Sequence, residues 1–378
     1  MPPWRGNQVR TMEWLRALRD HRLTLVAPTA PAGTDTGPLD LIEAEVREFP
    51  LPRMRMGLGA LTAVLTGRPA QEGLYHHVAA RRALRQALVA APPDVIVVQM
   101  VRCWWALAEV AATVPGTPVL FDAIDAMGLH FGRAARDLAV PLRPLARLEA
   151  ARCHGLEAEL ARSAAVTTAV SRRDLEALGV AQGTGRVVPV SAPARRRGDL
   201  VDPPAVLLSG NLGYRPTVKG ALWFARNVWP LIRAQTSKVR WVLAGARPSA
   251  AVRRLAALPG VEVHADVPDL APFFRRARVA IAPMAGGSGV PMKVLEAWAA
   301  GVPVVAHPWS AAGLEALPGR DLLTAEGCRE FADAVVQLYK DSTRARAIGE
   351  AGREVWQRLY EPRRVAEAVR SAVTAALA

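Results

Sequence analysis

Short apolar runs rich in β-branched residues recur along the chain, each followed by a turn with glycine or proline and then by an amphipathic helical stretch. Most of these runs are continuous rather than alternating, which is typical of strands covered by helices on both faces. Their alternation with helices predicts a parallel α/β sheet in each half of the chain. The predicted strands are Leu23–Ala27, Val95–Val98, Val119–Asp122, Val166–Ala169, Val187–Val190, Val206–Ser209, Arg240–Ala244, Val261–His264, Val279–Pro283 and Val302–Ala306.

A stretch rich in proline and arginine separates the two halves. Residues 189–204 include the arginine triplet 195–197 followed by Gly198, a combination typical of a solvated connector. Two similar α/β domains on one connector leave a cleft, and the carboxyl ends of parallel strands that border it are the usual ligand site. We therefore expect two Rossmann-like parallel-sheet domains facing a cleft. The predicted parts are domain 1–192, linker 193–204, domain 205–356 and a C-terminal helix 357–378 that packs across both domains.

Length and composition agree with this organisation. A chain of 378 residues with 51% hydrophobic and 22% charged residues exceeds one ordinary core and suits two. No window reaches the ~20 apolar residues of a spanning helix, and residues 1–7 have no apolar signal core. The sequence thus predicts a cytoplasmic protein.

The net charge of +14 raises the question whether the protein binds nucleic acid. Only four of the 48 basic residues are lysines, so an arginine-rich codon bias explains the charge as well as phosphate binding does. No nucleic-acid motif accompanies it, and we predict no nucleic-acid partner. The three cysteines are far apart and predict buried thiols, while His76 and His77 are adjacent and face apart on a helix, so we predict no metal and no cofactor.

The segment 282–303, APMAGGSGVPMKVLEAWAAGVP, carries the most specific chemistry. Its glycines allow close backbone approach, and a helix that begins near Val290 directs free amide groups toward a phosphate. Lys293 and Glu296 share one face of that helix, where the cation can neutralise a diphosphate and the carboxylate can accept hydrogen bonds from ribose hydroxyls. The alternative is a glycine-rich loop with a solvated Lys–Glu pair.

GSGVPMKVLEAWAAGVPVVA resembles the donor-nucleotide segment of glycosyltransferase family 4, whose members retain anomeric configuration and have the two-domain GT-B fold. LLSGNLGYRPTVKGALWFARNVWPLI (207–232), residues 241–274 and residues 313–339 agree with it. The similarity is strongest to the branch of sugar transferases associated with exopolysaccharide and exosortase systems. It covers nearly the whole chain and is weaker in the first half. It implies that the second domain binds the donor and the first the acceptor.

The resemblance assigns site residues by position. Glu296 matches the second glutamate of the family's Glu-x7-Glu element, whereas Ser288 stands where the first would be. Asn211 replaces an arginine of the family, which leaves Lys293 as the phosphate cation, with Arg215 as a possible substitute. The implied donor-site residues of the second domain are Gly210, Asn211, Arg215, Arg247, Val267, Ser288, Gly289, Val290, Lys293 and Glu296.

In the first half, PPWRGNQVR matches a loop that in the family follows the first strand and faces the donor phosphates, which points to Gly6 and Asn7. Because no strand precedes this loop, either the true start lies upstream or the first sheet lacks an inner strand. We expect an upstream start, and an unpaired strand position beside Leu23–Ala27 if Met1 is the start.

Asp122 and Asp125 lie at the end of a predicted strand and are the candidates, with Lys293, for catalytic residues that orient an acceptor hydroxyl or stabilise the leaving group. The alternative is one aspartate that ends a strand and another that caps a turn.

Arg53–Arg68 interleaves arginine with large apolar residues. Such a segment can dock on an anionic membrane or a lipid-linked acceptor, and the alternative is a helix buried against the sheet. The leading hypothesis is a glycosyltransferase that uses a nucleotide diphosphate sugar and a saccharide, lipid-linked or natural-product acceptor. The alternatives are a nucleotide-sugar epimerase of the same architecture and a non-catalytic binding protein. The donor base, the sugar, the acceptor and the oligomeric state stay open.

Overall fold

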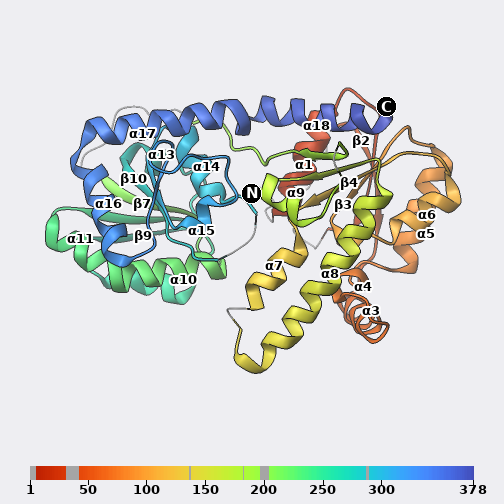
Figure 1. Ribbon diagram of the computed structural model, residues 1–378, viewed down its shortest axis with the longest axis horizontal. Helices are drawn as coiled ribbons and strands as arrows, with labels where there is room; N and C mark the ends of the chain where they lie inside the picture. Colours follow the sequence, from red (N-terminus) through yellow and green to blue (C-terminus); the bar gives the residue numbers. More distant parts are fainter. Residues whose placement is uncertain (1–5, 31–41, 136–137, 182, 196–203, 287–288) are drawn as a thin grey trace. The chain divides into compact units, whose positions relative to one another are not determined.

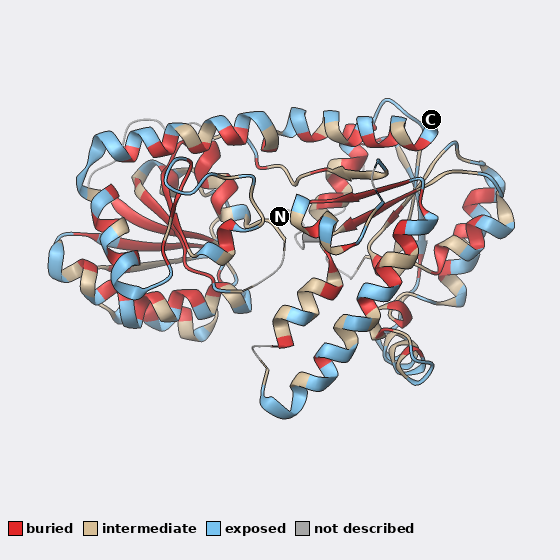
Figure 2. Ribbon diagram, in the orientation of Figure 1, coloured by how far each residue is buried: buried red, intermediate tan, exposed pale blue. Residues whose placement is uncertain are grey.

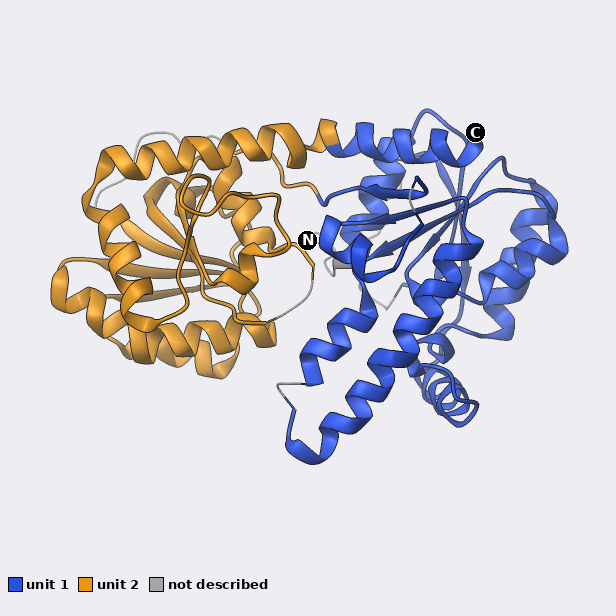
Figure 3. Ribbon diagram, in the orientation of Figure 1, with its two compact units in different colours: residues 1–190, 365–378 blue, residues 191–364 orange. Residues whose placement is uncertain are grey.

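The computed structural model describes residues 6–30, 42–135, 138–181, 183–195, 204–286 and 289–378. The chain divides into two compact units, coloured separately in Figure 3: unit 1 comprises Met1–Val190 and Val365–Ala378, and unit 2 comprises Ser191–Arg364. Both units contain parallel strands flanked by helices (Figure 1). The fold class is thus the predicted one, an α/β chain with parallel sheets in each half. The predicted linker 193–204 lies mostly outside the described residues.

Unit 1 contains two parallel sheets. A two-stranded sheet has the order β1-β2, and a four-stranded sheet has the order β3-β4-β5-β6. The strands are β1 (Leu23–Pro28), β2 (Ala44–Phe49), β3 (Ile96–Gln99), β4 (Val119–Ile124), β5 (Val166–Ala169) and β6 (Gly185–Val187).

The strands of unit 1 mostly follow the sequence prediction, with two corrections. The last strand ends at Val187 rather than beginning there, and β2, AEVREF, was not predicted because its charged residues hide the apolar pattern. Strand β1 pairs with β2 from Leu23↔Ala44 to Pro28↔Phe49. Among the described residues no strand pairs with the other edge of β1, which agrees with the predicted unpaired position.

Helices cover both faces of the four-stranded sheet of unit 1. One buried cluster joins α5 and α6 to β3. Another joins Trp14 of α1 to Leu120 of β4 and to Val369 of the C-terminal helix. The helices are α1 (Gly6–Ala17), α3 (Arg53–Leu65), α4 (Ala70–Gly73), α5 (Val78–Ala90), η1 (Val101–Cys103), α6 (Ala106–Thr113), α7 (Met127–Ala134), η3 (Val140–Leu142), α8 (Arg143–Ser163), α9 (Arg172–Ala177) and α18 (Pro362–Leu377).

Unit 2 is built on one parallel sheet of six strands in the order β12-β11-β10-β7-β8-β9. The strand order therefore reverses between β7 and β10. The strands are β7 (Ala205–Asn211), β8 (Arg240–Ala246), β9 (Val261–Ala265), β10 (Ala277–Ala282), β11 (Val304–Ala306) and β12 (Leu323–Thr324). All except the two-residue β12 were predicted from apolar runs.

An aromatic core fixes one face of this sheet. Trp241 of β8 is fully buried, with its ring centroid 4.7 Å from that of Phe224 and 5.7 Å from that of Trp229. Phe331 packs on Phe224 at 5.9 Å. The helices are α10 (Arg215–Trp223), η4 (Phe224–Val228), α11 (Trp229–Gln235), α12 (Ala250–Arg253), η5 (Arg254–Ala257), α13 (Ala271–Arg276), α14 (Met292–Ala299), α15 (Pro308–Ala311), α16 (Cys328–Lys340), α17 (Ser342–Val355) and η6 (Trp356–Tyr360).

Helix α3 is mostly exposed, whereas most strands of the sheets are buried (Figure 2). Its side chains Met54, Leu58, Leu61 and Leu65 are 81%, 60%, 55% and 77% exposed, and its one buried residue is Ala63. This contradicts the alternative of a helix buried against the sheet. The cysteine prediction was also partly wrong, because Cys153 is buried whereas Cys328, the first residue of α16, is exposed.

Candidate functional site

The reversal of strand order in unit 2 marks where a ligand is expected, outside the carboxyl ends of β7 and β10. Gly210, near the end of β7, has φ +108°, a conformation that favours glycine. A Cβ atom on Gly245 of β8 would lie 1.8 Å from the carbonyl oxygen of Gly210. Glycine at both positions lets the two strand ends approach closely and leaves the backbone open to a ligand.

Lys293 lies at this strand end. It is the second residue of α14, and its Nζ atom is 4.0 Å from the place that a Cβ atom on Gly210 would occupy. Burial lowers the pKa of Lys293 to about 8, an effect that the nearby carboxylate of Glu296 opposes. The amino end of α14 has no side-chain cap, so a cation and uncapped backbone amides meet at one point.

Glu296 follows one turn later on α14 and carries the negative charge of the site. Its side chain is 15% exposed, and its Oε1 atom lies 3.5 Å from Nη2 of Arg195. Burial raises the pKa of Glu296, while the charges of Arg195 and Lys293 lower it. The opposite side of the helix is buried in the core through Val294, Leu295, Ala297 and Trp298. Lys293, beside Gly210 at the carboxyl end of β7, and Glu296 lie outside this buried side, and we call these three residues the rim.

Four further predicted residues lie at or just after the ends of β7, β8 and β9. Asn211 folds back, and its Oδ1 atom accepts a hydrogen bond of 3.0 Å from the amide of Gly213. Arg215 is exposed at the start of α10. Arg247, also exposed, has φ +52°, and its amide donates to Oδ1 of Asp266 at 2.6 Å. Val267 is half-buried in the loop after β9.

The glycine-rich turn is described in part. Gly289 has φ +71°, and Val290 beside it is half-buried. Ser288 lies outside the described residues. A Cβ atom on Gly313 would lie 3.0 Å from the carbonyl oxygen of Gly289, so the turn is packed closely against a second glycine.

The structure changes the picture of the amino-terminal candidates. Gly6 and Asn7 are the first two residues of helix α1 rather than part of a loop. The expected loop was inferred from the motif, but the amphipathic stretch after it already begins its helical turn at Gly6. Asn7 accepts a hydrogen bond at its carbonyl oxygen from the Thr11 hydroxyl, 3.0 Å away, as a residue inside a helix does.

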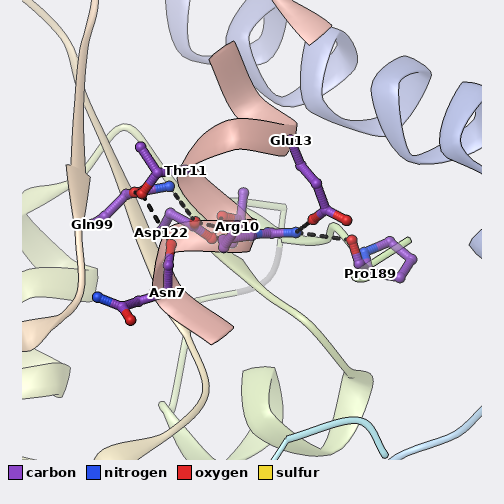
Figure 4. Close-up of polar contacts among 8 residues, drawn as sticks. Asn7, Arg10, Thr11, Glu13, Gln99, Asp122 and Pro189 are labelled. Atoms are coloured by element: carbon purple, nitrogen blue, oxygen red, sulfur yellow. Dashed lines mark hydrogen bonds and ion pairs between the residues drawn. The ribbon is translucent and has the colours of Figure 1, made fainter. Parts of the chain in front are cut away.

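Asp122 lies inside unit 1, with no exposed surface. Figure 4 shows its polar contacts. Both of its oxygens accept from Arg10, from Nη2 and Nε at 3.0 Å each. Gln99 adds a hydrogen bond of 3.1 Å and Thr168 one of 2.7 Å. The carboxylate is thus saturated by protein donors and cannot contact an acceptor hydroxyl in this arrangement. This favours the alternative that Asp122 is a structural residue at the end of a strand.

Asp125 is half-buried in the turn between β4 and α7 and lies near two other carboxylates. Glu157 of α8 accepts hydrogen bonds from the amides of Met127 at 2.5 Å and Gly128 at 3.1 Å. Burial, with the charges of Asp125 and Asp174, raises the pKa of Glu157 to about 7, although the hydrogen bonds from the amides of Gly128 and Met127 lower it. Asp125 therefore stays a candidate for contact with an acceptor, in a strongly acidic corner of unit 1.

The sequence analysis missed Arg195. It was assigned with its neighbours to a solvated connector, yet its side chain is only 15% exposed and contacts Glu296. No local pattern distinguishes it from the two arginines that follow. Within the described residues no three His, Cys, Asp or Glu side chains lie together as metal ligands. The absence of a metal at this site stays a prediction.

Comparison with family models gives a match to glycosyl transferases group 1 over residues 203–341. That range contains β7, β8, β10 and α14, and thus the rim formed by Gly210, Lys293 and Glu296. Over these residues unit 2 is similar to glycosyl transferases group 1. The narrower assignment to family 4 and its exosortase-associated branch is not tested by this match.

Solved structures share the fold of the whole chain. Anabaena HepE in complex with UDP and glucose has a TM-score of 0.64 at 14% identity, over 98% of this chain and 96% of that one. Sucrose-phosphate synthase from Thermosynechococcus elongatus has a TM-score of 0.70 at 14% identity, over 98% of this chain and 93% of that one. CalG4, the calicheamicin glycosyltransferase, has a TM-score of 0.52 at 19% identity, over 96% of this chain and 94% of that one. The fold is that of GT-B glycosyltransferases. A search of curated proteins finds no match.

Proposed function

We propose that this chain is a glycosyltransferase that binds a nucleotide diphosphate sugar on unit 2 and transfers the sugar to a hydroxyl acceptor. The observation that carries the proposal is the position of Lys293, with its Nζ atom beside Gly210 at the point where the strand order reverses. The group 1 match over residues 203–341 supports it. The HepE complexes with UDP and UDP-glucose make a uridine nucleotide the first donor to test.

In this proposal each group at the rim has a separate task. Lys293 and the amide groups at the start of α14 bind the diphosphate, which carries the negative charge that grows when the glycosidic bond breaks. Glu296 accepts hydrogen bonds from the ribose hydroxyls. Gly210, Asn211, Gly289 and Val290 form the surrounding backbone, and Val267 lies in the loop that we assign to the base. Arg215 and Arg247 are the additional cations.

Transfer with retention of configuration is the outcome we propose, on the basis of the resemblance of residues 282–303. The departing diphosphate would then take the proton of the acceptor hydroxyl, and no metal would be required. In unit 1 we retain Asp125 as the acceptor-side candidate, and Gly6 and Asn7 at the start of α1. The acceptor is a saccharide, a lipid-linked sugar or a natural product.

Peripheral contact with a membrane is a further part of the proposal. The exposed side chains Met54, Leu58, Leu61 and Leu65 of α3 are spaced by four, three and four residues, so they form one apolar stripe. Arg53 and Arg55 at the start of the helix are exposed and suit an anionic surface. No helix of the described residues has the length and apolar content to cross a membrane.

Product analysis tests the proposed reaction. The protein is first screened for thermal stabilisation by UDP, GDP, ADP and TDP, because a ligand of the folded state raises its stability. It is then incubated with the matching nucleotide sugar, with and without acceptors. A glycosyltransferase releases nucleoside diphosphate and forms a new glycoside, whose anomeric configuration NMR reports. An epimerase leaves the sugar on the nucleotide, and a binding protein binds the donor without turnover.

A further inference from the structure

Arg195 is the first basic residue of the segment that precedes β7, and it is bound on both sides of its guanidinium. Nη2 lies 3.5 Å from Oε1 of Glu296, and Nη1 donates to Oδ1 of Asp269 at 3.2 Å. The ring centroid of Phe274 lies 5.4 Å from the guanidinium carbon. Arg195 is therefore packed against Phe274 of α13 and Glu296 of α14.

The environment of Glu296 explains what this contact does. Burial raises the pKa of Glu296, and the charged groups that face it among the described residues are Arg195 and Lys293, with Asp269 behind Arg195. Lys293 is half-buried, and desolvation disfavours the charged form of its amine. Arg195 is thus, with Lys293, a cation that lowers the pKa of Glu296 against the effect of burial.

The contact also restricts the carboxylate. Glutamate has three side-chain torsions, and an unrestrained carboxylate would sample several rotamers before it could accept two hydroxyl groups. The ion pair joins Nη2 of Arg195 to Oε1 of Glu296. Nε of Arg195 is buried and has no hydrogen-bond partner among the described residues, so the guanidinium retains a donor.

We propose that Arg195 is a positioning residue of the donor site, which holds the carboxylate of Glu296 for the ribose hydroxyls. The inference rests on the proposed function, because it concerns the same site. Asp269 and Phe274 hold Arg195 in turn. Arg195 therefore contributes to recognition of the ribose and not to binding of the diphosphate.

A comparison of two ligands separates these contributions. The affinity of the nucleoside diphosphate that stabilises the wild-type protein is measured by calorimetry, and so is that of its 2′,3′-dideoxy analogue, which cannot donate to Glu296. The ratio of the two dissociation constants reports ribose recognition. The titration of the diphosphate and of Lys293 affects both ligands and cancels in this ratio.

The wild-type ratio should fall only below the raised pKa of Glu296, and in Arg195→Met the fall should begin at a higher pH. In Arg195→Met the ratio should fall toward one as pH decreases, by up to about tenfold per pH unit below the raised pKa of Glu296. Arg195→Lys should restore part of the ratio. Asp269→Asn, which weakens the support of Arg195, should shift the ratio in the same direction by less.

Arg226, exposed on the helical segment after α10, supplies the matched control. Arg226→Met should keep the wild-type ratio, and melting temperatures establish that each variant is folded. If Arg195→Met weakens both ligands equally, or leaves both unchanged, the inference is wrong and the proposed function stands. If the wild-type protein binds none of the four diphosphates, the proposed function itself is wrong. If Arg195→Met does not fold, Arg195→Lys and Asp269→Asn decide by the same ratio.

Discussion

Arg10 and Asp122 form an ion pair that is completely buried inside unit 1, with two hydrogen bonds of 3.0 Å between them. A third guanidinium nitrogen of Arg10 donates to the carbonyl oxygen of Pro189 at 2.8 Å. The pair thereby joins helix α1 to the end of β4 and to the segment after β6. Because this pair occupies both oxygens of Asp122, we expect Asp122 to stabilise the fold of unit 1.

Asp122→Asn should lower the free energy of unfolding of unit 1 by about 3 to 5 kcal/mol, because the buried Arg10 charge loses its hydrogen-bonded carboxylate and keeps Glu13 at 4.0 Å. Arg10→Met combined with Asp122→Leu should cost less, because neither charge of the pair remains buried. Urea unfolding followed by tryptophan fluorescence measures both. Asp20, 80% exposed, provides the control Asp20→Asn. A loss below about 1 kcal/mol for Asp122→Asn would contradict the assignment.

The pKa of Lys293, lowered to about 8, predicts the pH profile of the enzyme. Only the protonated amine attracts the diphosphate, so kcat/KM should fall above about pH 8. In Lys293→Arg this alkaline limb should disappear, since the guanidinium stays charged, even if the rate is lower throughout. Lys238 is exposed, and Lys238→Arg should keep the wild-type profile. An alkaline limb that persists in Lys293→Arg would assign it to another group.

Removal of each rim side chain should have a distinct kinetic effect. Glu296→Ala should weaken nucleoside diphosphate binding by about 1 to 3 kcal/mol, the range for hydrogen bonds to a charged partner. Lys293→Met should lower turnover more than donor affinity, because charge on the diphosphate grows in the transition state. Steady-state kinetics and calorimetry measure the two effects, with Glu350→Ala, at an exposed residue of α17, as control. If Lys293→Met behaves like the wild type, the phosphate cation is Arg215 or Arg247.

Glu157 predicts how stability depends on pH. Its pKa is raised from 4.5 to about 7 by burial, so the folded chain binds this proton more tightly than the unfolded chain. Stability should therefore fall as pH rises from about 4.5 to 7, by roughly 3 kcal/mol from this group. Glu157→Gln should flatten that decline, as measured by thermal unfolding. Glu159→Gln on the same helix should not, since Glu159 is 43% exposed. An equal slope in both variants would exclude Glu157 as the source.

The apolar stripe of α3 predicts binding to anionic vesicles. Replacement of Met54, Leu58, Leu61 and Leu65 by serine should reduce co-sedimentation at least about tenfold, because each loses apolar area that a membrane would bury. Stability should change little, since all four are exposed. The matched control is Val78→Ser with Val89→Ser, two exposed apolar residues of α5. Wild-type protein that does not bind such vesicles, or a stripe variant that binds equally, would rule out this contact.

Much of the fold could be predicted because the relevant signal is local. Uncharged runs such as Val166–Ala169 and Val206–Ser209 became buried parallel strands, since a charged side chain on a strand covered on both faces needs a buried partner. Strand β2 escaped prediction because four of its six residues are exposed and need no apolar side chain. Lys293 and Glu296 could be predicted to lie together because side chains three residues apart on a helix share a face.

What the sequence by itself determined was therefore the order of strands and helices and the residues that a single helix brings together. Only the tertiary structure decided which charged groups meet. Arg10 pairs with Asp122 across 112 positions, and Arg195 crosses from the connector to Glu296 on α14. The physical reason is that a buried charge needs a partner, and any of several residues of opposite charge would satisfy it. Which residue becomes the partner depends on how the packed sheets and helices place the backbone. No local sequence pattern encodes the distance between two charged residues that are far apart in the chain.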